Sequence, residues 1–180
     1  MDLLPFGEIE VEGKVMIKGK GLAQIAVNGF REVYENGTDL VSFENKQAFK
    51  VCTLPGIVIL KLIAYDDRPE VRQNDIKDIS LILKHYFNIE TDIIYEQHND
   101  LFEDNRDTPI IAARVLGRQM KRIIGKSIDL EKRVIAILQR EIDNSEKSKV
   151  AELMVRGTDN SIADALEILK EILQGIKDMV

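Results

Sequence analysis

The sequence predicts an α/β (α+β) protein in which a small mixed or antiparallel N-terminal sheet is followed by a mostly helical C-terminal part. Before Thr53, short apolar stretches are separated by turn residues, and Ile9 and Val11 alternate with glutamates, a period of two that is typical of strands. From Leu54 onward the apolar spacing becomes three to four, which is typical of helices. The 180 residues are 44% hydrophobic and 31% charged, so the chain can bury a core and still dissolve.

The N-terminal part is expected to contain two β-rich stretches around a short helix. Ile9 and Val11 alternate with glutamates, and Gly13-Lys14 interrupts the run before 15–17, which predicts a hairpin that turns at Gly13-Lys14. Residues 30–35 suit a short helix closed by Asn36-Gly37. Residues 40–43 and 48–53 then suit two strands on either side of a turn at 44–46.

Helices are expected from Leu54 to the end of the chain. Thr53 is a predicted cap of the first helix, which has Pro55 in its first turn and ends before Pro69. The starts and stops of the others follow from capping residues, prolines and glycines: a cap at Asn74, a helix over 91–103, one from Thr108-Pro109 to Gly125, one starting at Ser127, and two over 145–156 and 161–178.

Three segments are predicted along the chain: a β-rich part over 1–53, a helical part over 54–143 and a helical extension over 144–180. Gly157–Asn160 is the best candidate linker. The last helix carries a wide apolar stripe that includes Ile162, Leu166 and Leu173. This stripe can dock to a partner or to a second copy of the chain, or it can fold back to cover the chain's own apolar surface.

Charge and composition exclude several functional classes. The formal net charge of −6 disfavours general binding to nucleic acids or anionic membranes, because phosphates repel an acidic chain. No signal peptide and no apolar run of about 20 residues are present, so we expect a cytoplasmic protein. The one cysteine, Cys52, is expected to be a buried strand residue, and His98 is expected at the surface without a predictable partner.

Charged residues gather at the join between the first two predicted helices. Lys61 and Arg68 are seven residues apart and therefore share a helix face, and Asp75 and Asp78 are three apart on the next helix. Lys61 lies inside an apolar run, where a lysine needs a carboxylate or a ligand. We therefore expect Lys61 within ion-pair distance of Asp75 or Asp78. The set is either an ion-pair network that joins two helices or a ligand site.

A second set of cations is predicted on one face of the fourth helix. Arg114, Arg118, Lys121 and Arg122 follow one another at offsets of four, seven and eight from Arg114. Such a stripe is either a solvated face or a surface that contacts the phosphates of a triphosphate or an RNA backbone.

Several short strings together resemble one protein family. They are Asp2-Leu3-Leu4-Pro5-Phe6-Gly7, Val27-Asn28-Gly29-Phe30-Arg31-Glu32, Leu54-Pro55-Gly56, Leu60-Lys61-Leu62-Ile63-Ala64-Tyr65-Asp66-Asp67-Arg68 and Asp75-Ile76-Lys77-Asp78-Ile79. In this order and spacing, the chain resembles predicted bacterial nucleotidyltransferases of the polymerase-β superfold, near the AbiEii-type abortive-infection toxins of toxin–antitoxin systems. The resemblance covers roughly residues 2–125.

The resemblance implies a function and a role for each matching residue. Such proteins transfer a nucleotide from an NTP to an acceptor, which is unknown here, and they use two Mg²⁺ ions held by three carboxylates. Asp2 matches the third carboxylate, both a catalytic and a metal-binding role. The resemblance further implies that Lys61 contacts phosphates, and that Arg68, Asp75 and Asp78 face the nucleotide.

The family's first two carboxylates, an Asp-x-Asp pair that follows Gly-Ser, have no counterpart in the sequence. The chain thus resembles the rear two-thirds of such a protein. We expect it to be inactive alone and to use Mg²⁺ only if the missing segment is supplied. Labelled NTP transfer that disappears in Asp2→Ala would refute this expectation. The alternative function is a non-catalytic helical protein-interaction module or a homodimer.

Overall fold

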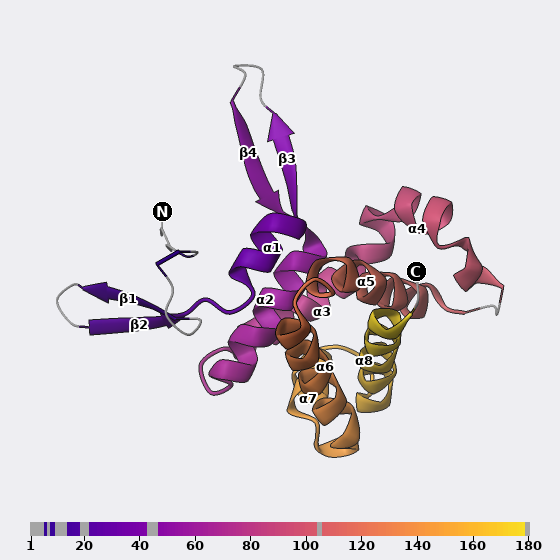
Figure 1. Ribbon diagram of the computed structural model, residues 1–180. Helices are drawn as coiled ribbons and strands as arrows, with labels where there is room; N and C mark the ends of the chain where they lie inside the picture. Colours follow the sequence, from indigo (N-terminus) through magenta and orange to yellow (C-terminus); the bar gives the residue numbers. More distant parts are fainter. Residues whose placement is uncertain are drawn as a thin grey trace.

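In the computed structural model, two antiparallel β-hairpins at the N-terminal end project from a body of packed helices (Figure 1). The structure describes residues 6, 8–9, 14–18, 22–42, 47–103 and 106–178. This arrangement confirms the predicted fold class, an antiparallel N-terminal part followed by a mostly helical C-terminal part. The strands form two separate two-stranded sheets rather than one shared sheet.

The first hairpin turns at a different place from the predicted one. Strand β1 spans Lys14–Lys18 and pairs with β2, Leu22–Ala26, in a register that joins Lys18 to Leu22. The reversal that joins β1 to β2 therefore follows β1, and it is not the predicted turn at Gly13-Lys14, of which Gly13 lies outside the described residues. The alternation of exposed Lys14, buried Val15 and exposed Met16 is the expected period of two.

The second hairpin confirms the other predicted β-rich stretch. Helix α1, Phe30–Asn36, leads through Gly37 into β3, Thr38–Ser42, which pairs with β4, Ala48–Cys52. The end of β4 is tied back to the end of α1, because the Thr53 amide donates to the Gly37 carbonyl at 2.9 Å. The hairpin therefore rises from a fixed point beside the first long helix, as Figure 1 shows.

The helical part follows the predicted boundaries closely. Helix α2, Leu54–Asp67, begins at the Thr53 cap, whose hydroxyl accepts from the Gly56 amide at 3.4 Å. The next helices are α3 (Gln73–Ile89), α4 (Thr91–Gln97), α5 (Thr108–Ile124), α6 (Ile128–Asp143), α7 (Lys149–Val155) and α8 (Ile162–Lys177), with 3₁₀ turns η1 (Asn99–Phe102) and η2 (Ser145–Lys147). Three predictions were wrong: α3 starts before Asn74, the helix over 91–103 breaks at His98, and the helix over 145–156 breaks at Ser148.

The last helix packs on the chain's own body. Helix α8 crosses α5 at two glycines, where a Cβ added to Gly117 would lie 2.1 Å from the Ile172 carbonyl oxygen. One added to Gly175 would lie 2.2 Å from the Arg114 carbonyl oxygen. The helix backbones therefore touch directly. Leu166, Leu169, Ile172 and Leu173 are buried in a single core that also takes in residues from α1 to α7.

The burial of α8 decides one of the predicted alternatives. Its apolar stripe folds back on the chain rather than remaining free for a partner or a second copy. The homodimer that the sequence suggests as an alternative function is untested and stays a prediction. Within the part of the chain that the structure describes, no helix has the length and apolar character needed to cross a bilayer.

Candidate functional site

A groove of about 620 Å³ opens between the N-terminal elements and α2, with the start of α3 at its edge. Its lining combines cations, two carboxylates and an apolar wall: Lys14, Asn28, Phe30, Cys52, Ile57, Leu60, Lys61, Ile63, Ala64, Asp67, Arg68, Arg72 and Asp75. Two of the predicted nucleotide-facing residues of α2, Lys61 and Arg68, thus lie in the same groove as Asp75 of α3.

Lys61 lies in the seam between α2 and α3, as the spacing predicts. Its ammonium donates to Asp75 Oδ1 at 2.9 Å and to Asp78 Oδ2 at 2.6 Å. Both predicted carboxylates therefore contact Lys61, and the expected ion pair is confirmed. An ammonium has three N–H donors, so Lys61 retains one that the two aspartates do not use.

The local chemistry keeps Lys61 charged. Burial alone would lower the pKa of its ammonium, but the hydrogen bonds and charges of Asp78 and Asp75 together raise that pKa above its ordinary value. Asp75 is the more enclosed partner, with 12% of its side chain exposed against 53% for Asp78. The pair joins α2 to α3 and places a permanent cation in the groove wall.

The second carboxylate oxygen of Asp75 is under-satisfied. Asp75 Oδ2 is buried and accepts no hydrogen bond from any described residue, and Arg72 Nη1 lies 3.7 Å from it. A buried acceptor without a donor is costly and uncommon in native proteins. A ligand hydroxyl or a small movement of Arg72 would satisfy it.

The groove carries an excess of positive charge. Four of its lining residues are cationic, Lys14, Lys61, Arg68 and Arg72, and two are acidic. Asp67, one of the two acids, is already paired with Arg133 of α6 at 2.5 Å. Among the described residues, Lys14 and Arg68 have no carboxylate partner and are exposed, so both are available to an anion.

The apolar wall lies beside these cations. Ile57, Leu60 and Ile63 of α2 contribute to it, and Phe30 of α1 adds an aromatic ring. Cys52 lies at the end of β4, where partial burial raises the pKa of its thiol and favours the neutral form. The predicted strand position is confirmed, but Cys52 is half-buried rather than buried, packing against the core while also bordering the groove.

The described residues do not fit the Mg²⁺ ions that the family resemblance implies. Asp75 and Asp78 hold the ammonium of Lys61 rather than a metal ion. No group of three His, Cys, Asp or Glu side chains within the described ranges lies close enough to hold a metal. Asp2, the predicted metal ligand, lies outside the described residues.

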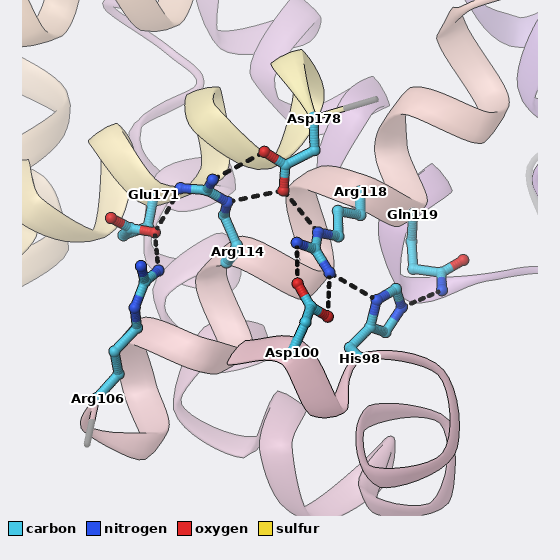
Figure 2. A network of polar contacts seen from close by, with 8 residues as sticks. All are labelled: His98, Asp100, Arg106, Arg114, Arg118, Gln119, Glu171 and Asp178. Atoms are coloured by element: carbon cyan, nitrogen blue, oxygen red, sulfur yellow. Dashed lines mark hydrogen bonds and ion pairs between the residues drawn. The ribbon is translucent and has the colours of Figure 1, made fainter. Parts of the chain in front are cut away.

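The predicted basic face of α5 forms a buried ion-pair network instead of a stripe (Figure 2). Arg114 binds Asp178 through two bonds of 2.8 and 2.9 Å and also reaches Glu171 at 3.1 Å. Arg118 binds Asp178 at 2.6 Å and the carboxylate of Asp100 at 2.6 and 2.8 Å. A solvated face is therefore wrong for these two arginines, and their donors are already engaged by carboxylates.

The remaining members of that set lie closer to the surface. Lys121 pairs with Glu131 of α6, whereas Arg122 is exposed and contacts the side-chain amides of Gln97 and Gln119. The four cations are thus divided among different partners, and this arrangement does not present a continuous surface to a phosphate backbone.

His98 is buried within this network rather than at the surface, which corrects the expectation. Its Nδ1 lies 3.2 Å from Arg118 Nη1 and its Nε2 lies 3.3 Å from the Gln119 amide (Figure 2). A guanidinium can only donate, so a hydrogen bond from Arg118 requires that Nδ1 carry no proton. Burial and the charge of Arg118 lower the pKa of His98 below its ordinary value. The break between α4 and η1 places this ring in the core.

A comparison of the chain with models of protein families, with curated proteins and with solved structures gives no match.

Proposed function

We propose that the chain is a nucleotidyltransferase-like protein whose groove binds a nucleoside triphosphate. The observation that carries the proposal is the composition of the groove, in which four cations and an apolar wall share one cavity of about 620 Å³. A nucleotide has the same two parts, a polyanionic phosphate chain and a flat, largely apolar base. Ligand sites commonly combine an apolar lining with a few well-placed charged groups.

Each groove residue has a distinct role in this proposal. The unused N–H of Lys61 donates to a phosphate oxygen, and Asp75 and Asp78 hold the ammonium in place. Arg68, at the end of α2, has a planar guanidinium that matches two phosphate oxygens at once. The apolar side chains of Phe30, Ile57 and Leu60 cover the base.

The carboxylates shape the specificity of the site. Asp75 Oδ2 has no hydrogen-bond donor among the described residues, so a sugar hydroxyl that reached it would gain a strong acceptor. Transfer of the bound nucleotide to an acceptor is the reaction that the resemblance implies. The residues described in the groove bind and orient the triphosphate.

Calorimetric titration of the full chain tests this proposal. We expect ATP and inorganic triphosphate to bind, and adenosine to bind more weakly than ATP, because the phosphates contact the cations. Arg68→Gln should weaken ATP binding about tenfold, the usual size of a hydrogen bond to a charged group. Removing Arg68 leaves no described carboxylate unpaired, so the loss reports on the ligand.

Lys170→Gln is the matched control, since Lys170 is an exposed cation on α8 outside the groove. It loses the same charge and should bind ATP as the unmodified chain does. Absence of binding at millimolar ATP and triphosphate would reject the proposal. Equal losses in Arg68→Gln and Lys170→Gln would show that only the net charge matters and would also reject it.

A further inference from the structure

The negative charge of the chain is concentrated in one segment. Residues 86–105 contain six acidic residues and no lysine or arginine, namely Glu90, Asp92, Glu96, Asp100, Glu103 and Asp104. Their formal charge of −6 equals the net charge of the whole chain, −6, so the other residues sum to zero. The segment runs from the end of α3 through α4 and η1, on the opposite side of the molecule from the β1–β2 hairpin (Figure 1).

An aromatic patch, defined by Phe87, Tyr95 and Phe102, lies within this segment. The rings of Tyr95 and Phe102 are stacked, with centroids 4.9 Å apart and planes within 13°. Phe87 meets both rings edge-on, with centroids 6.0 Å from Tyr95 and 6.4 Å from Phe102. The three rings come from α3, α4 and η1, so they fix these elements against one another.

The elements that carry the aromatic patch are anchored in the core by buried residues, while Tyr95 is exposed to solvent. Ile94 and Leu101 are buried in the core and anchor α4 and η1. Tyr95, the next residue of α4, lies on a different face of the helix from Ile94, and 54% of its surface is exposed. Because Phe102 covers one face of the Tyr95 ring, its other face is the one available for contact.

Uncompensated carboxylates surround the exposed ring. Asp92 and Glu96 lie three positions before and one position after Tyr95 on α4, and they share a helix face at a spacing of four. Glu103 follows Phe102 directly. All three are exposed, and none pairs with a cation among the described residues. Asp100, by contrast, is already neutralised by Arg118.

We propose that the aromatic patch is a docking surface for a basic segment of a partner protein. An arginine or lysine side chain laid over the free face of Tyr95 would gain a cation–π contact, and its charge would be matched by Asp92, Glu96 and Glu103. A nucleic acid would be repelled by the same carboxylates. The ring supplies the contact surface, and the carboxylates select a cationic partner.

The chain already contains one contact of this kind. On β4 and α1, Lys50 Nζ lies 4.0 Å from the centroid of the Tyr34 ring. Tyr34 is exposed to a similar extent, 48% against 54% for Tyr95. The difference is that the described residues place no cation over Tyr95, so this ring is open to a cation from outside this part of the chain.

Fluorescence anisotropy with a labelled peptide of alternating glycine and arginine tests the proposal on the full chain. We expect saturable binding, and a peptide with glutamate in place of arginine should not bind. Tyr95→Leu keeps the apolar surface but removes the π face, and it should weaken binding about two- to fivefold, the usual range for an exposed cation–π contact. Tyr34→Leu is the control, because Lys50 already covers that ring.

The role of the carboxylates is tested by a second pair of variants. Asp92→Asn/Glu96→Gln should weaken binding more than Glu146→Gln/Asp159→Asn, which removes the same charge from exposed residues elsewhere on the chain. Equal effects of the two double variants would show non-specific attraction to an acidic protein and would overturn the proposal. Unchanged affinity in Tyr95→Leu, preferential binding of RNA, or concentration-dependent dimerisation that Tyr95→Leu abolishes would overturn it as well.

Discussion

Replacement of Lys61 by methionine separates the structural role of the α2–α3 seam from its proposed role in binding. Methionine keeps the length of the side chain but removes the ammonium, so Asp75 loses the one hydrogen bond that the described residues give its carboxylate. Loss of one partner from a fully buried ion pair costs about 3–5 kcal/mol. Arg72 remains 3.7 Å from Asp75, and Asp78 is 53% exposed. We therefore expect a smaller loss, about 2 kcal/mol.

Urea denaturation at neutral pH measures this loss. The Lys61→Met/Asp75→Asn double variant should recover more than half of it, because a neutral amide tolerates burial better than an unpaired carboxylate. Lys77→Met is the control, since Lys77 is exposed and has no carboxylate partner among the described residues. It should change the free energy of unfolding by no more than about 0.5 kcal/mol. If Lys61→Met were no more destabilising than Lys77→Met, the seam would not stabilise the fold.

Three further predictions concern α8, the buried network and the groove. Gly175→Ala places a Cβ 2.2 Å from the Arg114 carbonyl oxygen and should cost about 1–3 kcal/mol in urea denaturation. Glu167→Ala, at an exposed position of the same helix, should cost less, and equal losses would contradict the close crossing. The pKa of His98 is lowered from 6.5 in the folded chain. As the pH falls below 6.5, the unfolded chain therefore binds a proton that the folded chain does not, and the folded chain loses stability. In thermal unfolding between pH 7.5 and 5, His98→Gln should reduce the dependence of the melting temperature on pH, and an unchanged dependence would argue against a neutral buried ring. The raised pKa of the Cys52 thiol should make its alkylation by iodoacetamide slow. Because Cys52 borders the groove, saturating ATP should slow this alkylation further, as followed by mass spectrometry. A rate that ATP leaves unchanged would place the nucleotide elsewhere.

The helices were predictable because their signals are local. Thr53 and Pro55 mark the start of α2, and Gly125 follows the last residue of α5. Ser161 and Asp164 form a capping box at the start of α8, so this start is also written into neighbouring residues. The pairing of Lys61 with its two aspartates was predictable for the same reason, because only a short loop separates α2 from α3.

The errors arise where contacts span long stretches of sequence. Arg114 and Arg118 are separated from Asp178 by 64 and 60 residues, so the pattern of α5 alone does not reveal that α8 brings a carboxylate to them. His98 is buried because the chain breaks between α4 and η1 and turns the ring toward Arg118. A polar neighbourhood in sequence, with Asn99 and Asp100 beside it, suggested a surface residue instead.

The groove is lined by some residues that local sequence patterns predicted and by others that these patterns missed. The pattern around α2 indicated Lys61, Arg68 and Asp75, all of which line it. Lys14 and Arg72 were missed, because Lys14 comes from a hairpin with a shifted turn and Arg72 from the loop before α3. Their charges change the character of the cavity from a balanced ion-pair network to a cationic groove.

Backbone amide NMR of the full ¹⁵N-labelled chain, titrated with ATP, tests the central claim most directly. Nucleotide binding in the groove predicts that the largest shifts fall on Cys52, Lys61 and Arg68, which line it, while residues of the buried network such as His98 and Arg118 change little. Inorganic triphosphate should reproduce the shifts at Lys61 and Arg68 but not those along the apolar wall. Shifts that are absent at millimolar ATP, or that gather away from α2, would contradict the assignment of this groove as the nucleotide site.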